Sequence, residues 1–288
     1  MKKNLWKLKS KDRQIPFKKA LVWIFLSTLF ISGTTAVVIL YYFHVQEIQL
    51  QDDYFNIRTI VQIGREKGFF EDDYLSDLMG FSPNKKINLV GFNVESAEKK
   101  LLTFPLIKTA KITKMKPHTL AVEYSLRKPI FVLLDYENTA MDDEGVIFPL
   151  RPYFQKNELP AVKLGGLPKD NFLGMRIDSD KLSFIFDLTE KLNSIPAFRE
   201  LSLKQIDLEK MNASSLGKRE IIVQLSETKH FSEWLLRMSP KEITPQLLDF
   251  FVLRNYLLAN NVFQLEGGMT RLPQIIDLRI PSLAFILL

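Results

Sequence analysis

The residues of this chain that could do chemistry are three histidines and a few acidic pairs. His44, His118 and His230 lie far apart, without the short spacings that metal ligands use. There is no cysteine, which excludes a thiol nucleophile, a disulfide and Cys-ligated zinc. The sequence also lacks G-x-S-x-G, H-E-x-x-H and Gly-rich phosphate-loop motifs. We therefore expect no enzymatic activity, no cofactor, no metal and no small-molecule substrate.

The acidic clusters are better explained by structure than by catalysis. Asp142-Asp143-Glu144 comes directly before Gly145, which is typical of a solvated hairpin turn. Asp72-Asp73 suits the first turn of a helix, where acidic side chains interact favourably with the helix dipole. Asp207 and Asp277 fall in strand-like patterns and could flank a groove, although the sequence does not bring them together.

A basic stretch covers residues 104–129, FPLIKTAKITKMKPHTLAVEYSLRKP, where Lys and Arg outnumber the single acid Glu123. The net charge of +6 lies elsewhere: residues 1–19 hold eight Lys/Arg and one Asp, and the other 269 residues hold 31 Lys/Arg and 32 Asp/Glu. A nucleic-acid-binding domain carries its basic excess on its folded part, so we expect no nucleic-acid partner. The lysines of 104–129 then line the solvated face of a hairpin, or face lipid headgroups or an acidic partner helix.

A membrane anchor is predicted at residues 20–43, ALVWIFLSTLFISGTTAVVILYYF, which contain no charge. As a helix this segment is about 36 Å long, against a hydrocarbon core of about 30 Å. The basic tail, residues 1–19, then stays in the cytoplasm, and residues 44–288 lie across the cytoplasmic (inner) membrane. A cleaved signal peptide is the alternative, with Thr34-Thr35-Ala36 as a weak cleavage site, but the apolar run continues beyond it.

The rest of the chain predicts an α+β fold in two modules, 44–127 and 128–288. In the first, HVQEIQLQ predicts a strand at 44–51, and Asn56 and Gly68 predict the limits of a helix. Two further helices are expected at 72–80 and 93–105. Two strands joined by a turn at Lys116–His118 complete a β-α-α-β-β order.

The second module is predicted to be richer in strands. The expected elements are a hairpin with Glu144-Gly145 at its tip, a short strand within 159–166, a helix at 179–195, neighbouring strands in 201–209 and 218–225, and a helix at 243–261. Thr244 is the expected cap of the last helix, because Pro245 then takes the first helical position.

Five motifs in this order resemble the FtsQ/DivIB family of bacterial cell-division proteins. They are FPLIKTAKI at 104–112, MKPHTLAVEYSLRKPIFVL at 115–133, DDEGVIFPL at 142–150, LPAVKLGG at 159–166 and QIIDLRI at 274–280. The chain departs from the family pattern at several aromatic or small positions: Leu106 and Lys116 replace tryptophans, Ile280 replaces a tyrosine, and Leu283 replaces a glycine. Leu126 stands where the family has an acid.

The resemblance implies a single-pass membrane protein with a POTRA domain and a β domain. It implies a non-enzymatic divisome scaffold at the septum, whose closing strand binds the small bitopic proteins FtsB and FtsL. Other divisome members and septal wall synthases are further partners that it implies. An exposed strand edge would let a partner strand add to the sheet. The residues expected to bind the partner are Gln274, Ile276, Asp277, Leu278, Arg279 and Ile280.

Three alternatives stay open on the sequence alone. Residues 274–280 could form an internal strand whose side chains only pack. The protein could be a POTRA-containing envelope or secretion-apparatus anchor outside division, or a membrane-anchored cell-wall enzyme.

Overall fold

The computed structural model describes residues 17–66, 68–81, 86–155, 159–227, 232–260 and 274–287. Most of the predicted tail, and His230, lie outside these residues. The chain divides into two compact units: residues up to 61 with 81–94 and 113–121, and residues 62–80 with 95–112 and 122–288. The predicted module limits at 43, 127 and 128 stay predictions.

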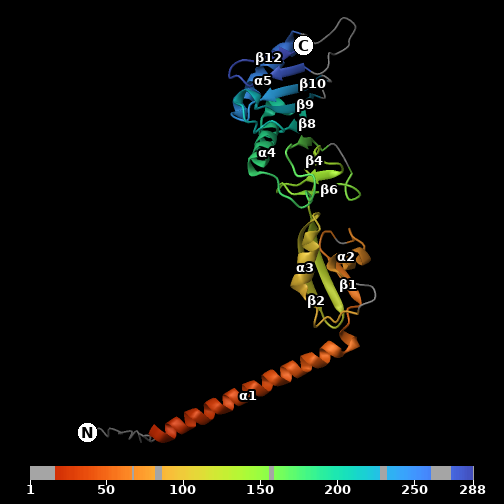
Figure 1. Ribbon diagram of the computed structural model, residues 1–288, viewed down its shortest axis with the longest axis vertical. Coiled ribbons are helices and arrows are strands. Elements are labelled where there is room, and N and C mark those ends of the chain that lie inside the picture. The colour runs from red at the N-terminus through yellow and green to blue at the C-terminus, as the bar shows by residue number, and fades with distance from the viewer. Residues whose placement is uncertain are drawn as a thin grey trace, which may run out of the picture. The chain divides into compact units, whose positions relative to one another are not determined.

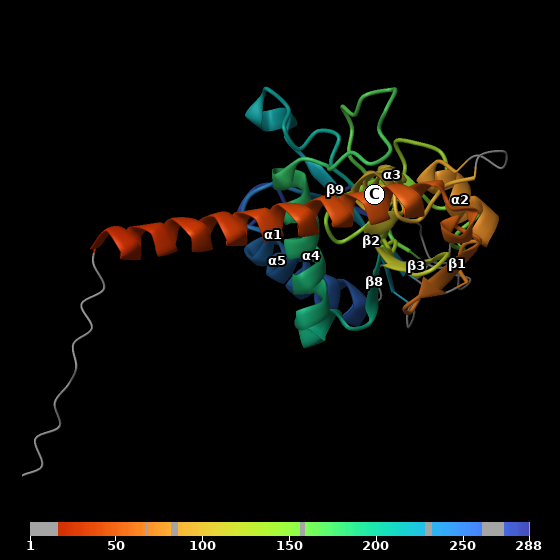
Figure 2. The same cartoon turned by 90° about the horizontal axis from the view of Figure 1, so that it is seen from below.

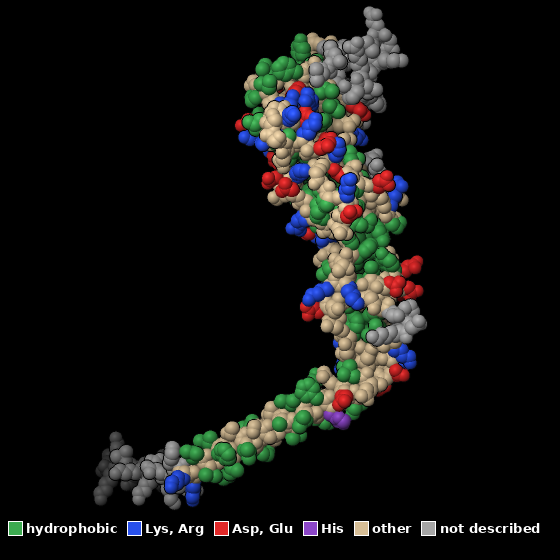
Figure 3. All heavy atoms as spheres, viewed as in Figure 1, with side chains coloured by type: hydrophobic (Ala, Val, Ile, Leu, Met, Phe, Trp, Pro, Cys, Tyr) green, Lys and Arg blue, Asp and Glu red, His purple; other side chains and the backbone are tan. Residues whose placement is uncertain are grey.

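The first unit is built on one long helix, α1 (Phe17–Gln51), which includes the whole uncharged segment. Figure 3 shows hydrophobic side chains along it, and by length and composition it is a candidate membrane span. The strand predicted at 44–51 is wrong, because α1 continues through these residues. Val45 and Ile48 are three residues apart, which also suits a helix, and extending an existing helix adds one hydrogen bond per residue fixed.

A three-stranded sheet has the order β1 (Thr59–Ile63), β3 (Thr119–Leu126), β2 (Ile107–Met115). The helix predicted after Asn56 is wrong, because residues 59–63 form β1. The sequence there is TIVQI, whose β-branched side chains favour an extended backbone. Helices α2 (Asp72–Met79) and α3 (Val94–Thr103) confirm the predicted pair, so the β-α-α-β-β order holds with a later first strand.

A buried hydrogen-bond network holds the segment between β1 and α2 in place. The Tyr124 hydroxyl lies 2.9 Å from Gln62 Oε1 and 2.8 Å from the Glu66 carbonyl, and accepts from Phe70 N at 3.2 Å. Gln62 Nε2 donates to the Phe70 carbonyl at 2.7 Å and to Asp72 Oδ1 at 2.7 Å. These contacts satisfy polar groups that would otherwise be buried without partners.

Within the residues that the structure describes, the larger sheet has nine strands. Their order is β12 (Phe285–Leu287), β11 (Gln274–Asp277), β10 (Ser232–Met238), β9 (Ile221–Glu227), β8 (Leu201–Asp207), β7 (Ala161–Lys163), β4 (Phe131–Leu133), β5 (Thr139–Met141), β6 (Ile147–Pro149). The β5–β6 hairpin and the antiparallel β8–β9 pair are confirmed. The sheet is mixed, because β11 runs parallel to β10, and β7 runs parallel to both β4 and β8. Strands β10 and β12 were not predicted.

Helices α4 (Ser179–Ser194) and α5 (Ile243–Ala259) lie on the same side of this sheet (Figures 1 and 2). Strand register aligns Val223, Leu236 and Ile276 across β9, β10 and β11, and all three are fully buried. They share one hydrophobic core with Ile185 of α4 and Phe250 of α5. The prediction that Thr244 caps the last helix is wrong. α5 begins at Ile243, and the cap residue is Glu242, with φ 56°.

We expect Tyr124→Phe to destabilise the protein by about 1–2 kcal/mol, because it leaves the acceptors and the Phe70 N–H without their buried partner. The measurement is urea unfolding of the detergent-solubilised full-length protein. Tyr256→Phe, at a side chain that is 64% exposed, is the matched control and should change stability little. Equal effects of the two substitutions would contradict a structural role for the network.

Candidate partner-binding site

The six residues predicted to bind a partner lie at one end of the nine-stranded sheet. Residues 274–277 form β11, whereas Leu278, Arg279 and Ile280 follow it. β11 pairs in parallel with β10 through residues 234–237 and in antiparallel with β12 through residues 285–287. The expectation that 274–280 form the edge of the sheet is therefore wrong, and in the part of the chain that the structure describes the edge belongs to β12.

A tight turn explains why the edge moves to β12. Leu283 N donates to the Ile280 carbonyl at 3.2 Å, and Ser282 has a positive φ of 62°. This turn brings 285–287 back alongside β11. The sequence signal was Pro281-Ser282 between two short apolar runs, a combination typical of a turn.

Burial separates the predicted residues into two groups. Ile276 and Leu278 are buried in the core, whereas Ile280 is 51% exposed. Only exposed side chains such as Ile280 can contact another protein without unfolding the sheet. Exposed apolar side chains nearby are Leu283 and Phe285 beside the turn and Leu248, Val252 and Tyr256 on α5.

The three α5 side chains form a stripe, because they recur every four residues on one helix face. A shallow groove of about 440 Å³ joins Val252 and Tyr256 of this stripe to Leu283 and Ala284. We call Leu248, Val252, Tyr256, Ile280, Leu283 and Phe285 together the C-terminal apolar surface, although Ile280 and Phe285 line a separate cavity and not this groove. Phe285 is the member of this set that belongs to β12.

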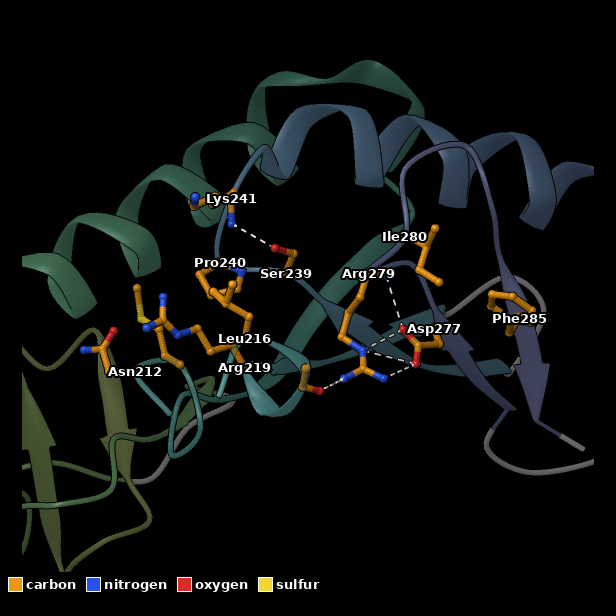
Figure 4. Close-up of a pocket in the computed structure, with 12 residues that line it drawn as sticks. Asn212, Leu216, Arg219, Ser239, Pro240, Lys241, Asp277, Arg279, Ile280 and Phe285 are labelled. Atoms are coloured by element: carbon orange, nitrogen blue, oxygen red, sulfur yellow. Dashed lines mark hydrogen bonds and ion pairs between the residues drawn. The ribbon is translucent and has the colours of Figure 1, made fainter. Parts of the chain in front are cut away.

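A larger cavity of about 670 Å³ lies beside β11 and β12 (Figure 4). Its lining includes Leu216, Arg219, Lys241, Arg279 and Phe285, so it combines apolar walls with basic groups. Arg219 Nε is already engaged, donating to the Ala213 carbonyl at 2.7 Å.

Asp277 and Arg279 bind each other within the chain. Arg279 donates to Asp277 through Nε at 2.9 Å and through its terminal nitrogen at 2.7 Å, as Figure 4 shows. It also donates to the Gly217 carbonyl at 3.2 Å. Arg237 lies 3.3 Å from Asp277 and also pairs with Glu220. These groups hold the strands together, so the predicted polar contacts are largely used inside the protein.

The charge network changes the acidity of its carboxyls. The hydrogen bond from Lys210 holds the pKa of Glu220 below its usual value, opposed by burial and helped by Arg237. For Asp277, burial raises the pKa, but the hydrogen bonds from Arg279 outweigh it and the pKa falls below its usual value. Asp277 raises the pKa of Arg279 in return.

The acidic cluster at 142–144 does not belong to the C-terminal apolar surface. Asp142-Asp143-Glu144 does form the β5–β6 turn, but Asp142 is fully buried rather than solvated, with Arg127 at 2.6 Å. Lys108 lies 3.1 Å from both Asp143 and Glu144. The sequence did not reveal that these acids are partners of the basic stretch.

Asp207 and Asp277 do not form a pair. β9 and β10 lie between β8 and β11, and neighbouring strands are about 4.8 Å apart. Asp207 instead lies 3.7 Å from Lys163. Within the described ranges, no cluster of three His, Asp or Glu side chains is arranged to hold a metal ion.

One comparison with known proteins bears on the region before the nine-stranded sheet. Residues 72–123 match the family model of the POTRA domain, FtsQ-type. The match runs from α2 into β3 and supports the resemblance to the FtsQ/DivIB family at the level of this domain. No curated protein matches the chain. The FtsQ-type POTRA domain suggests a protein related to cell division.

The stability of the protein should fall in acid because of Asp277 and Glu220. A carboxyl with a depressed pKa in the folded state contributes stability above its unfolded pKa of about 4 and loses it as pH falls through the folded pKa. We expect urea unfolding to show no contribution to pH dependence from these groups between about pH 7 and 5. Below about pH 4, the Asp277→Asn, Glu220→Gln double variant should lose less stability than the wild type.

Asp170→Asn, at an exposed residue, is the control for removing a charge. An acid dependence that is the same in the double variant and the wild type would contradict this assignment.

Proposed function

We propose that this protein is a non-enzymatic scaffold of the bacterial cell-division machinery, anchored in the cytoplasmic membrane by α1. The observation that carries the proposal is an FtsQ-type POTRA domain that follows a candidate membrane span. The POTRA domain and the nine-stranded sheet would lie outside the cytoplasm, because the basic N-terminal tail favours the cytoplasmic side. Its partners would be FtsB- and FtsL-like bitopic proteins, and the site of action the division septum.

The anchor predicts that the full-length chain stays in membranes after washing with alkaline carbonate. Phe30→Arg with Ile31→Arg should release a large part of it, since each Arg near the helix centre costs about 2.5–3.5 kcal/mol on insertion. Immunoblotting of membrane and soluble fractions measures this. Lys18→Arg with Lys19→Arg preserves charge at the helix start and is the control. A mature protein beginning near Val37 would contradict the anchor.

Partner binding is proposed at the edge of β12, with the C-terminal apolar surface beside it. An edge strand presents unpaired N–H and C=O groups, so a strand of the partner can add to it. Exposed apolar side chains then supply the contact area that selects the partner. Support comes from the position of β12 at the end of the sheet and from the exposure of Ile280 and Phe285.

We expect Ile280→Asp and Phe285→Asp each to abolish pull-down of the FtsB/FtsL-like pair by the full-length protein in detergent. Each places a charge where an apolar contact is proposed while leaving the core intact. Leu173→Asp is the matched control, because Leu173 is 45% exposed and lies outside the C-terminal apolar surface. Ile276→Asp is not diagnostic, since burying a charge at this position would unfold the sheet.

Retained pull-down in a folded Ile280→Asp, Phe285→Asp double variant would reject this docking surface. Affinity purification of the wild-type protein from membranes tests the broader proposal. Division proteins should co-purify, and a fluorescent fusion should gather at mid-cell. Co-purification of a secretion apparatus, with uniform distribution, would contradict a role in division.

A further inference from the structure

A groove of about 280 Å³ lies beside the last turns of α1. Tyr42, Val45, Gln46 and Gln49 line it from the helix. Leu89, Val90, Lys114 and Lys116 line it from the segment after α2 and from the end of β2. All eight residues belong to the first compact unit.

Hydrogen bonds fix the two walls of the groove to each other. Asn88 Nδ2 donates to the backbone carbonyls of Gln49 at 2.8 Å and Leu50 at 3.1 Å, which ties the segment before Leu89 to the end of α1. Lys114 Nζ donates to the Val90 carbonyl at 2.8 Å. The groove is therefore shaped before any ligand arrives.

The groups around the groove are mainly hydrogen-bond donors. Lys114 and Lys116 contribute ammonium groups, and Gln46 contributes an amide that also donates to the Tyr42 hydroxyl at 3.0 Å. Neither lysine forms an ion pair with a carboxylate in the part of the chain that the structure describes. An ammonium has three donors, so Lys114 keeps two after binding Val90. Partial burial lowers the pKa of Lys114.

The acid nearest in sequence does not neutralise this charge. Glu47 is the single acid between residues 43 and 51. At about 100° per residue, it is turned about 100–160° around α1 from Tyr42, Gln46 and Gln49. The groove thus has a net positive wall and several neutral donors, which suits a phosphate.

Its depth along α1 matches the outer headgroup layer. The uncharged segment ends at Phe43, and the groove covers residues 42–49, about 10 Å of helix at 1.5 Å per residue. Headgroups occupy about 5–8 Å on each side of the hydrocarbon core. Tyr42 also suits this layer, because its ring is apolar and its hydroxyl polar.

We infer that this groove binds the headgroup of an anionic phospholipid in the outer leaflet. The inference rests on the proposal that α1 spans the membrane. Lys114 and Lys116 bind the phosphate, Gln46 and Gln49 donate to it or to the glycerol oxygens, and Val45 and Val90 contact the adjoining carbon atoms. The bound lipid fixes the depth and orientation of the POTRA domain at the membrane surface.

Photocrosslinking of the full-length protein in nanodiscs tests this inference. A photoreactive phosphatidylglycerol should label peptides covering 86–92 and 113–118 more strongly than the matching phosphatidylcholine probe. Labelling of the basic tail, residues 1–19, serves as the internal reference within each sample. Lys114→Gln with Lys116→Gln should lower the ratio of groove to tail labelling about fivefold for each lysine removed.

Two further variants show whether a loss of labelling comes from the groove itself, from a general loss of positive charge or from misfolding. Lys111→Gln with Lys128→Gln removes the same charge from exposed positions outside the groove and should leave the ratio unchanged. Lys114→Arg with Lys116→Arg keeps both charges and should retain the preference for phosphatidylglycerol. Equal labelling by the two lipid probes, or an unchanged ratio after both lysines become Gln, would overturn the inference.

Soluble glycerol phosphate distinguishes a lipid site from a site for free phosphate. At millimolar concentration it should not reduce labelling of the groove, and full competition would overturn the lipid assignment. The glutamine variant should still pull down the FtsB/FtsL-like pair, because the groove and the C-terminal apolar surface share no residue. Failure of the lipid site is thereby distinguishable from failure of the scaffold proposal.

Discussion

Hydrogen bonding on both sides of β11 determines where the end of the nine-stranded sheet can meet another protein. β10 and β12 occupy both rows of backbone groups on β11. Ile276 then belongs to the core under α5, whereas Ile280 lies beyond the paired region and is exposed. Among the described residues, the edge of the sheet therefore belongs to β12, which lies outside the sequence motif, and Ile280 is the exposed apolar residue that the motif contributes.

The charges near β11 reinforce this arrangement. Glu220 and Asp277 are largely buried, and a buried carboxylate is costly unless a cation and further donors accompany it. Arg237 and Arg279 meet that need across three strands. A docking partner would thus find these groups already paired, and its contacts would depend mainly on apolar area and on the backbone of β12.

The basic residues of the stretch 104–129 lie in two different environments. Lys108 and Arg127 pair with the acidic turn at Asp142–Glu144, which belongs to the second unit with them. Lys114 and Lys116 belong to the first unit and line the groove beside α1. A run of lysines that looks uniform in the sequence is thus divided between an ion-paired part and a part that lines the groove.

The sequence by itself determined the features that depend on composition and local pattern. These are the apolar helix at 20–43, the α2–α3 pair, the strand alternation at Leu120–Leu126 and the POTRA resemblance. The predictions from the sequence are wrong at 44–51 and at 57–63. The short apolar runs there fit both the helical repeat and the strand repeat, and contacts with neighbouring segments determine which one forms. Only the tertiary structure decided that β12 covers β11, that Asp142 is buried, and that Lys114 faces α1. Each of these depends on which distant segments pair, and strand pairing and ion pairing leave no periodic trace in one chain.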